Sequence, residues 1–145
     1  ADKAVIDVVL EVLRTPKFSA HFELVYWKEM NNPGNINQHL IDELGSCRYG
    51  ICYLSEPLGH RKQKYQDNPN VVFEAGMLHG RSDPGSPRPA KWIPIREKSS
   101  PTPPFDIASE RTVLVPRDGE GQLKEEELRG ELIDRLQGLI ANKGR

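Results

Sequence analysis

The fold is decided by one stretch of the chain, Asn68-Pro69-Asn70-Val71-Val72-Phe73-Glu74-Ala75-Gly76-Met77-Leu78-His79-Gly80. It predicts a short helix that is apolar over most of its surface. Asn70 can cap the start of this helix, because its side-chain oxygen can accept hydrogen bonds from the unpaired N–H groups of the first turn. Gly80 can end the helix in a left-handed backbone conformation.

Glu74 is the single carboxylate on this apolar helix. Its spacing places it on one helical stripe with Val71, Ala75 and Leu78. An acid in such surroundings is either paired with a cation in the interior or held at the floor of a cleft, where it can act on a ligand. The helix by itself leaves both explanations open.

Composition excludes several classes of protein. A chain of 145 residues predicts one domain, and 20 basic against 21 acidic residues argue against direct nucleic-acid binding. The sequence has neither an apolar run long enough to cross a membrane nor the pattern of a signal peptide, so we expect a cytoplasmic protein without a membrane partner. Cys47 and Cys52 are expected to be free thiols, and the histidine spacing predicts no metal site.

The elements alternate along the chain in a way that is typical of an α/β fold. The expected helices are Asp2–Arg14, Ile36–Leu44, Asn70–Gly80 and Leu123–Asn142, and the expected strands are Phe18–Trp27, Tyr49–Leu54, Lys91–Ile95 and Arg111–Val115. This order predicts a flavodoxin-like parallel sheet with helices on both faces. Ser55–Pro69 is expected to be a long mobile loop, and Pro94 either weakens the prediction of its strand or places that strand near an edge of the sheet.

The first element of this sequence is a helix, whereas a flavodoxin-like chain begins with a strand in the interior of the sheet. We therefore expect a first strand and its following loop to lie upstream of Ala1. The sequence contains no glycine-rich phosphate loop. The upstream loop is the expected contact for the phosphates of a nucleotide ligand.

Three segments resemble one family. They are Trp27-Lys28-Glu29 followed by Pro33-Gly34, the motif DNPNVVFEAGMLHGR at 67–81, and PFDIASERTVLV at 104–115. Together they are similar to bacterial TIR-like domains, which include the TIR domains fused to bacterial STING proteins. The resemblance extends over about residues 2–142.

The resemblance implies an NAD⁺ glycohydrolase (NADase) of bacterial antiviral defence that cleaves the nicotinamide–ribose bond, with Glu74 as the catalytic residue. NAD⁺ is then the substrate, and no separate cofactor is implied. TIR domains commonly act as homo-oligomers, which implies an assembly loop containing Met30, Pro33 and Gly34. It also implies a sensor domain or partner outside this chain.

Five further residues are candidates for substrate binding: Trp27, Glu29, Tyr53, Ser55 and Arg61. Trp27 ends a predicted strand and could stack on a ring of the substrate, or it could be a core aromatic. Tyr53 and Ser55 end another predicted strand at the edge where ligands of such sheets bind. Glu29 could contact the ligand or cap the next helix, and Arg61 could meet the pyrophosphate or remain solvated.

Two other functions fit the same residues. A nucleoside 2-deoxyribosyltransferase-like enzyme also uses a glutamate in a Glu-x-Gly context to attack the anomeric carbon of a sugar. Alternatively, the chain is a non-catalytic TIR assembly or nucleotide-binding module, in which Glu74 is a buried structural acid.

Overall fold

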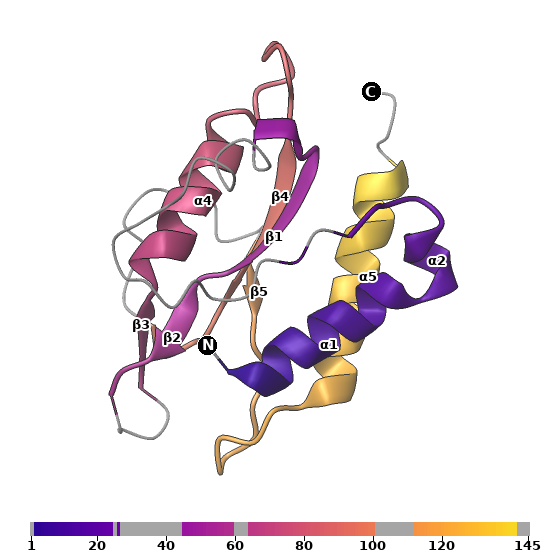
Figure 1. The fold of residues 1–145 in the computed structure, drawn as a ribbon. Helices are drawn as coiled ribbons and strands as arrows, with labels where there is room; N and C mark the ends of the chain where they lie inside the picture. Colours follow the sequence, from indigo (N-terminus) through magenta and orange to yellow (C-terminus); the bar gives the residue numbers. More distant parts are fainter. Residues whose placement is uncertain (1, 25, 27–44, 60–63, 101–111, 142–145) are drawn as a thin grey trace.

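The computed structural model describes residues 2–24, 26, 45–59, 64–100 and 112–141. Within these ranges the chain forms four helices and five strands (Figure 1). The elements are α1 (Lys3–Arg14), α2 (Pro16–Ser19), β1 (Tyr49–Tyr53), β2 (Ser55–Pro57), β3 (Tyr65–Asp67), α4 (Pro69–His79), β4 (Lys91–Arg96), β5 (Val113–Leu114) and α5 (Glu125–Ala141).

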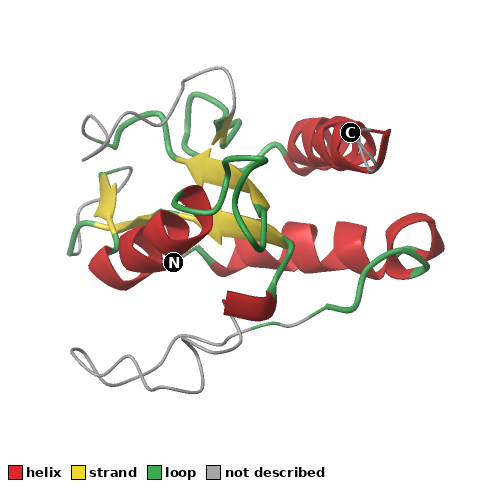
Figure 2. Cartoon of the chain, turned by 90° about the horizontal axis from the view of Figure 1, so that it is seen from above, coloured by secondary structure: helices red, strands yellow, loops and turns green. Residues whose placement is uncertain are grey.

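A parallel sheet forms the centre of the molecule, with the strand order β1-β4-β5. Its register pairs Ile51 with Ile93 and Ile95 with Val113. Helix α4 lies on one side of the sheet, and α1 and α5 lie on the other (Figure 1 and Figure 2). The predicted α/β class, with a parallel sheet and helices on both faces, is therefore confirmed for the described residues.

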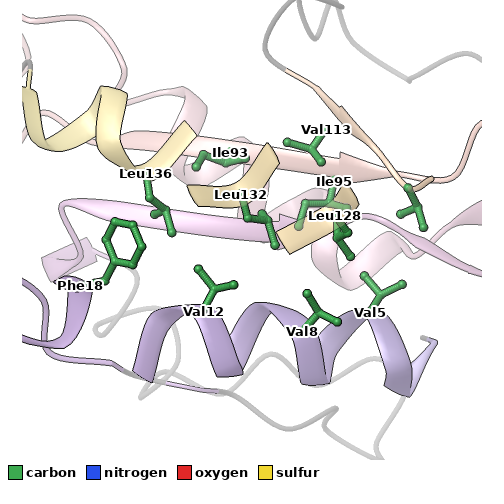
Figure 3. Packing of buried hydrophobic residues seen from close by; sticks show 11 residues of the cluster. Val5, Val8, Val12, Phe18, Ile93, Ile95, Val113, Leu128, Leu132 and Leu136 are labelled. Atoms are coloured by element: carbon green, nitrogen blue, oxygen red, sulfur yellow. The ribbon is translucent and has the colours of Figure 1, made fainter. Parts of the chain in front are cut away.

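The larger core lies between the sheet and the helices α1 and α5 (Figure 3). Strand side chains alternate between the two faces, so Ile93 and Ile95 point to the same side of the sheet. They meet apolar residues of α1, α2 and α5 and of the segment at β5 and just after it, namely Val5, Val8, Val12, Phe18, Val113, Val115, Leu128, Leu132 and Leu136. The helical spacing of the α5 leucines explains why this helix covers the sheet along its length.

A smaller core on the opposite face joins α4 to β1. Cys52 and Leu54 pack there against Ala75 and Leu78 of α4, together with Ala90. Gly50 allows the close approach, since a Cβ atom at this position would lie 2.3 Å from Cδ1 of Leu78. Strand β1 thus presents alternate residues to two different cores.

Pro94 lies in the central strand β4, so its expected place near an edge is wrong. The carbonyl oxygen of Ile95 accepts from Leu54 on the β1 side, whereas that of Arg96 accepts from Val115 on the β5 side. Pro94, two residues before Arg96, therefore turns its nitrogen toward β5. Pairing with β5 begins only at Ile95, so the missing N–H group of the proline costs no hydrogen bond of the ladder.

The strand expected over Phe18–Trp27 is wrong for the described residues, 18–24 and 26. Pro16 starts helix α2, because its fixed φ angle suits the first position of a helix. Phe18 is buried in the larger core, and the carbonyl of Phe18 accepts from the N–H groups of His21 and Phe22. The alternating residues that follow have no strand partner among the described residues.

The expected loop Ser55–Pro69 is also wrong in part, because it contains the antiparallel hairpin of β2 and β3. Ser55 pairs with Asp67, and Pro57 pairs with Tyr65. The hairpin follows β1 after a single residue and leads directly into α4. It therefore joins the carboxyl end of the sheet to the start of that helix.

The expected caps of α4 differ from those observed. Asn68, not Asn70, is the N-cap, and its side-chain oxygen accepts from the N–H groups of Asn70 and Val71. Pro69 then occupies the first helical position, where the absent N–H group is not needed. Gly80 ends the helix with φ of −61°, a right-handed conformation, instead of the expected left-handed one. The helix predicted over Ile36–Leu44 lies outside the described residues.

Candidate functional site

Glu74 lies in the middle of α4 and is half-buried. Its carboxylate has no hydrogen-bond or salt-bridge partner among the residues that the structure describes. Burial raises the pKa of the Glu74 carboxyl above its ordinary value, because desolvation disfavours the charged form. Among the described residues, no cation pairs with Glu74. They therefore give no support to the explanation that Glu74 is half of an interior ion pair.

The surroundings of Glu74 place it near the carboxyl end of β1. Burial, and to a smaller extent the negative charge of Glu74, raises the pKa of the Cys52 thiol to about 12. Cys52 is the residue before the last in β1 and points toward α4. In sheets of this type, ligands bind at the carboxyl ends of the strands. Glu74 is therefore close to the edge where a ligand is expected.

A polar cluster lies at the same edge but on the other face of the sheet, in which Glu97 is buried and Asp2, Tyr53 and Arg117 are half-buried. Arg117 binds Glu97 through two nitrogens, with Nε to Oε2 at 2.8 Å and Nη2 to Oε1 at 2.5 Å. Its Nη2 atom also donates to Oδ2 of Asp2 at 2.7 Å. The hydroxyl of Tyr53 donates to Oε1 of Glu97 at 2.8 Å. This cluster connects the start of α1 with the ends of β1 and β4.

Charge and burial keep Tyr53 neutral and Arg117 charged. Burial, followed by the charge of Glu97 and the hydrogen bond to it, raises the pKa of the Tyr53 phenol, which therefore stays neutral. The hydrogen bond to Glu97 raises the pKa of Arg117 further above its already high value. Arg117 also lies over the ring of Tyr65, with 5.5 Å between its guanidinium carbon and the ring centroid.

Ser55 belongs to the same edge of the sheet and is buried. Its hydroxyl oxygen accepts from the N–H of Glu97 at 2.9 Å and lies 2.8 Å from the hydroxyl oxygen of Ser100. Tyr53 packs against the core of α1 and α5, whereas Glu74 lies on the helix that covers the opposite face. The structure therefore brings Tyr53 and Ser55 together around Glu97 and not around Glu74.

A second ion pair ties the hairpin to the sheet. Arg96 holds both carboxylate oxygens of Asp67, with Nη2 at 3.0 Å from Oδ2 and Nε at 3.2 Å from Oδ1. The side chains are 8% and 15% exposed, so the pair is largely removed from water. The next residue, Asn68, donates from its side chain to Oε2 of Glu56 at 2.8 Å.

The remaining candidates from the sequence lie outside the described residues. They are Trp27, Glu29 and Arg61, together with Met30, Pro33 and Gly34 of the expected assembly loop. Their roles stay predictions.

Local sequence patterns point only weakly to Glu97, Arg117 or the Arg96–Asp67 pair. Arg96 is the last residue of the largely apolar strand β4 and Glu97 follows it, and that position could have marked them as residues of the ligand edge. Their partners could not be recognised, because Arg117 is 20 residues from Glu97 and 115 from Asp2.

Over the described ranges, no three His, Cys, Asp or Glu residues are grouped in a way that could hold a metal ion. Among the described helices, none combines the length and apolar character that crossing a bilayer requires. No family model, no curated protein and no solved structure matches the chain.

Proposed function

We propose that the chain is an NAD⁺ glycohydrolase domain with a flavodoxin-like, TIR-like fold, and that Glu74 is its catalytic residue. One observation carries the proposal: Glu74 is a half-buried carboxylate, without a described partner, on an apolar helix that packs against a parallel sheet. Such an acid costs stability, which is typical of a residue retained for chemistry. The segments at 67–81 and 104–115 support the choice of NAD⁺ through their similarity to bacterial TIR-like domains.

The proposed reaction converts NAD⁺ and water into nicotinamide, ADP-ribose and a proton. The bond between the ribose C1′ and the pyridinium nitrogen breaks, and its electron pair leaves with the ring, which becomes neutral nicotinamide. The leaving group is already cationic, so no general acid is required, in contrast to an ordinary glycoside with its two carboxylates. Water then forms the new C1′–O bond and releases the proton to solvent.

In this reaction, the carboxylate of Glu74 stabilises the positive charge that develops on the ribose. It could also trap that charge as a glycosyl ester, which water then hydrolyses with release of Glu74. A carboxylate that is not neutralised by a neighbouring cation acts with its full charge. Its partial burial lowers the local dielectric and strengthens the attraction.

We further propose that the domain acts as a homo-oligomer in bacterial defence, in the cytoplasm, and is activated through a sensor domain or partner. The support is the similarity of Trp27–Glu29 and Pro33–Gly34 to the assembly loop of TIR domains.

The test is to incubate the protein with NAD⁺ and to measure free nicotinamide by chromatography, both in dilute solution and in crowded, assembled samples. Glu74→Gln should abolish nicotinamide release and leave the circular-dichroism spectrum unchanged. Glu120→Gln is the matched control, because Glu120 is an exposed acid outside the candidate site and should keep the activity of the parent chain.

A second assay separates the alternative enzyme class. The protein is incubated with a deoxynucleoside and a different free base, and the new deoxynucleoside is measured. Base exchange without any nicotinamide release would overturn the proposal in favour of a deoxyribosyltransferase. The absence of both products, even in assembled samples, would leave a non-catalytic module.

A further inference from the structure

Two consecutive residues at the end of β4 form ion pairs on opposite sides of the sheet. Arg96 pairs with Asp67 of the hairpin, and Glu97 pairs with Arg117. Successive side chains of a strand point to opposite faces, so the two pairs serve different layers of the molecule. The Glu97 pair reaches α1 through Asp2, whereas the Arg96 pair reaches the segment that starts α4.

The start of α4 is held by several contacts within two residues. Asp67 is bound by Arg96, and the N–H of Asn68 donates to the carbonyl of Leu54 at 2.7 Å. The side chain of Asn68 donates to Glu56 and accepts from the first turn of the helix. These contacts join the N-cap of α4 to β2 and, through Arg96, to the central strand.

The other end of α4 is held against β1 by Leu78, which packs closely over Gly50. Glu74 lies between the two attachments, six residues after Asn68 and four before Leu78. An α-helix rises about 1.5 Å per residue and behaves as a stiff rod over this length. If the first turn of α4 moves, the depth at which Glu74 is buried against β1 therefore changes as well.

We propose that Arg96 is a positioning residue for Glu74: by holding Asp67, it sets where α4 begins and how deeply the Glu74 carboxylate lies against β1. The contacts described above support this positioning of Glu74, and the effect of the positioning on catalysis rests on the proposed function. Arg96 itself is buried and is assigned no contact with substrate.

The test is to titrate the Glu74 carboxyl of the full chain by carbon-13 NMR, because its pKa reports how deeply it is buried. The nearby Cys52 thiol does not interfere, since its pKa of about 12 keeps it neutral over the titration. Displacement toward water should lower the pKa of Glu74 toward the ordinary value of about 4.3. Loss of the Arg96 charge raises this pKa and loss of the Asp67 charge lowers it, so the two charges are removed together and their effects oppose each other.

The main variant is Asp67→Asn with Arg96→Met, which removes both charges of this pair together. The matched control is Glu97→Gln with Arg117→Met, which removes the other pair. We expect the pKa of Glu74 to fall in the first variant and to remain at the wild-type value in the second. An unchanged or raised pKa in the first variant, or an equal fall in both, would overturn the proposal.

Arg96→Lys is a milder variant, which keeps the charge but loses the two-pronged contact. We expect a smaller fall in the pKa of Glu74, and this variant decides the question if the double variants do not fold. No fall in a folded Arg96→Lys protein would then count against the positioning role.

Nicotinamide release provides a second measurement. In the Asp67→Asn, Arg96→Met variant, kcat should fall about 10-fold to 100-fold, since small displacements of a catalytic group have effects of this size. KM should change little, and Arg96→Lys should recover part of kcat. A wild-type chain that releases no nicotinamide would refute the proposed function, while the titration would still decide whether Arg96 positions Glu74.

Discussion

Replacement of Arg117 by Met should be among the most destabilising single changes in the protein. Arg117 is the only described cation bound to Glu97, whose side chain is 2% exposed. Removal of one partner of a buried pair leaves an uncompensated charge, at a cost of about 3–5 kcal/mol. Arg117→Met also removes the bonds to Asp2 and to the carbonyl oxygen of Gly121, so we expect the upper part of this range.

The assay is urea unfolding followed by circular dichroism, together with thermal melting. For a domain of this size, a loss of 1 kcal/mol lowers Tm by roughly 3 °C, so Tm should fall by about 10–15 °C. The double variant Glu97→Gln, Arg117→Met should lose less stability than Arg117→Met alone, because no buried charge remains. A loss below about 1 kcal/mol for Arg117→Met, or a double variant that is simply additive, would refute the reasoning.

Three further changes test other parts of the structure. Gly50→Ala should cost about 1–3 kcal/mol in urea unfolding, because the new Cβ would lie 2.3 Å from Cδ1 of Leu78; no loss would mean that the Leu78 side chain can move aside without cost. Leu132→Ala should cost about 2–5 kcal/mol, since Leu132 is fully buried between α1 and the sheet, whereas Leu114→Ala at an exposed site should cost far less. Glu74→Gln should stabilise the protein at pH 7, because the pKa of Glu74 is raised in the folded state. The stability of the wild type therefore falls as the pH rises from the unfolded-state pKa through the folded-state pKa, and the glutamine variant does not share this loss. Equal stabilities of Glu74→Gln and wild type at pH 7 in urea unfolding, or a gain only at acidic pH, would contradict a raised pKa.

Elements with a strong periodic pattern could be predicted from the sequence. The apolar run at 49–54 corresponds to β1, and the amphipathic patterns at 2–14 and 123–142 correspond to α1 and α5. The sequence predicts helix α4 at the correct place, but it indicates Asn70 as the cap, whereas the structure has Asn68 there. Both asparagines can cap, and the choice depends on Pro69, which suits the first position of a helix.

Local patterns predict the wrong element where two of them compete. Apolar and other residues alternate at 22–26 as they do in a strand. Pro16 nevertheless begins a helical turn just before them, and Phe18 packs in the core of α1 and α5. The polar composition of 55–69 suggested a loop, but cross-strand pairs such as Glu56 with Gln66 form a hairpin there. Pro94 suggested an edge, although its missing N–H group falls where β5 has not yet begun to pair.

For the candidate site, the sequence alone singled out Glu74, because a carboxylate within an apolar helical stripe is visible in a local pattern. Only the tertiary structure showed that Glu74 lacks a partner among the described residues, that Tyr53 and Ser55 gather around Glu97, and that Arg96 holds Asp67. Periodicity reports which side of an element is buried, since it depends on neighbours within a turn or two. Which cation meets which acid depends on the path of the chain between them, and for Asp2 and Arg117 that path is 115 residues long.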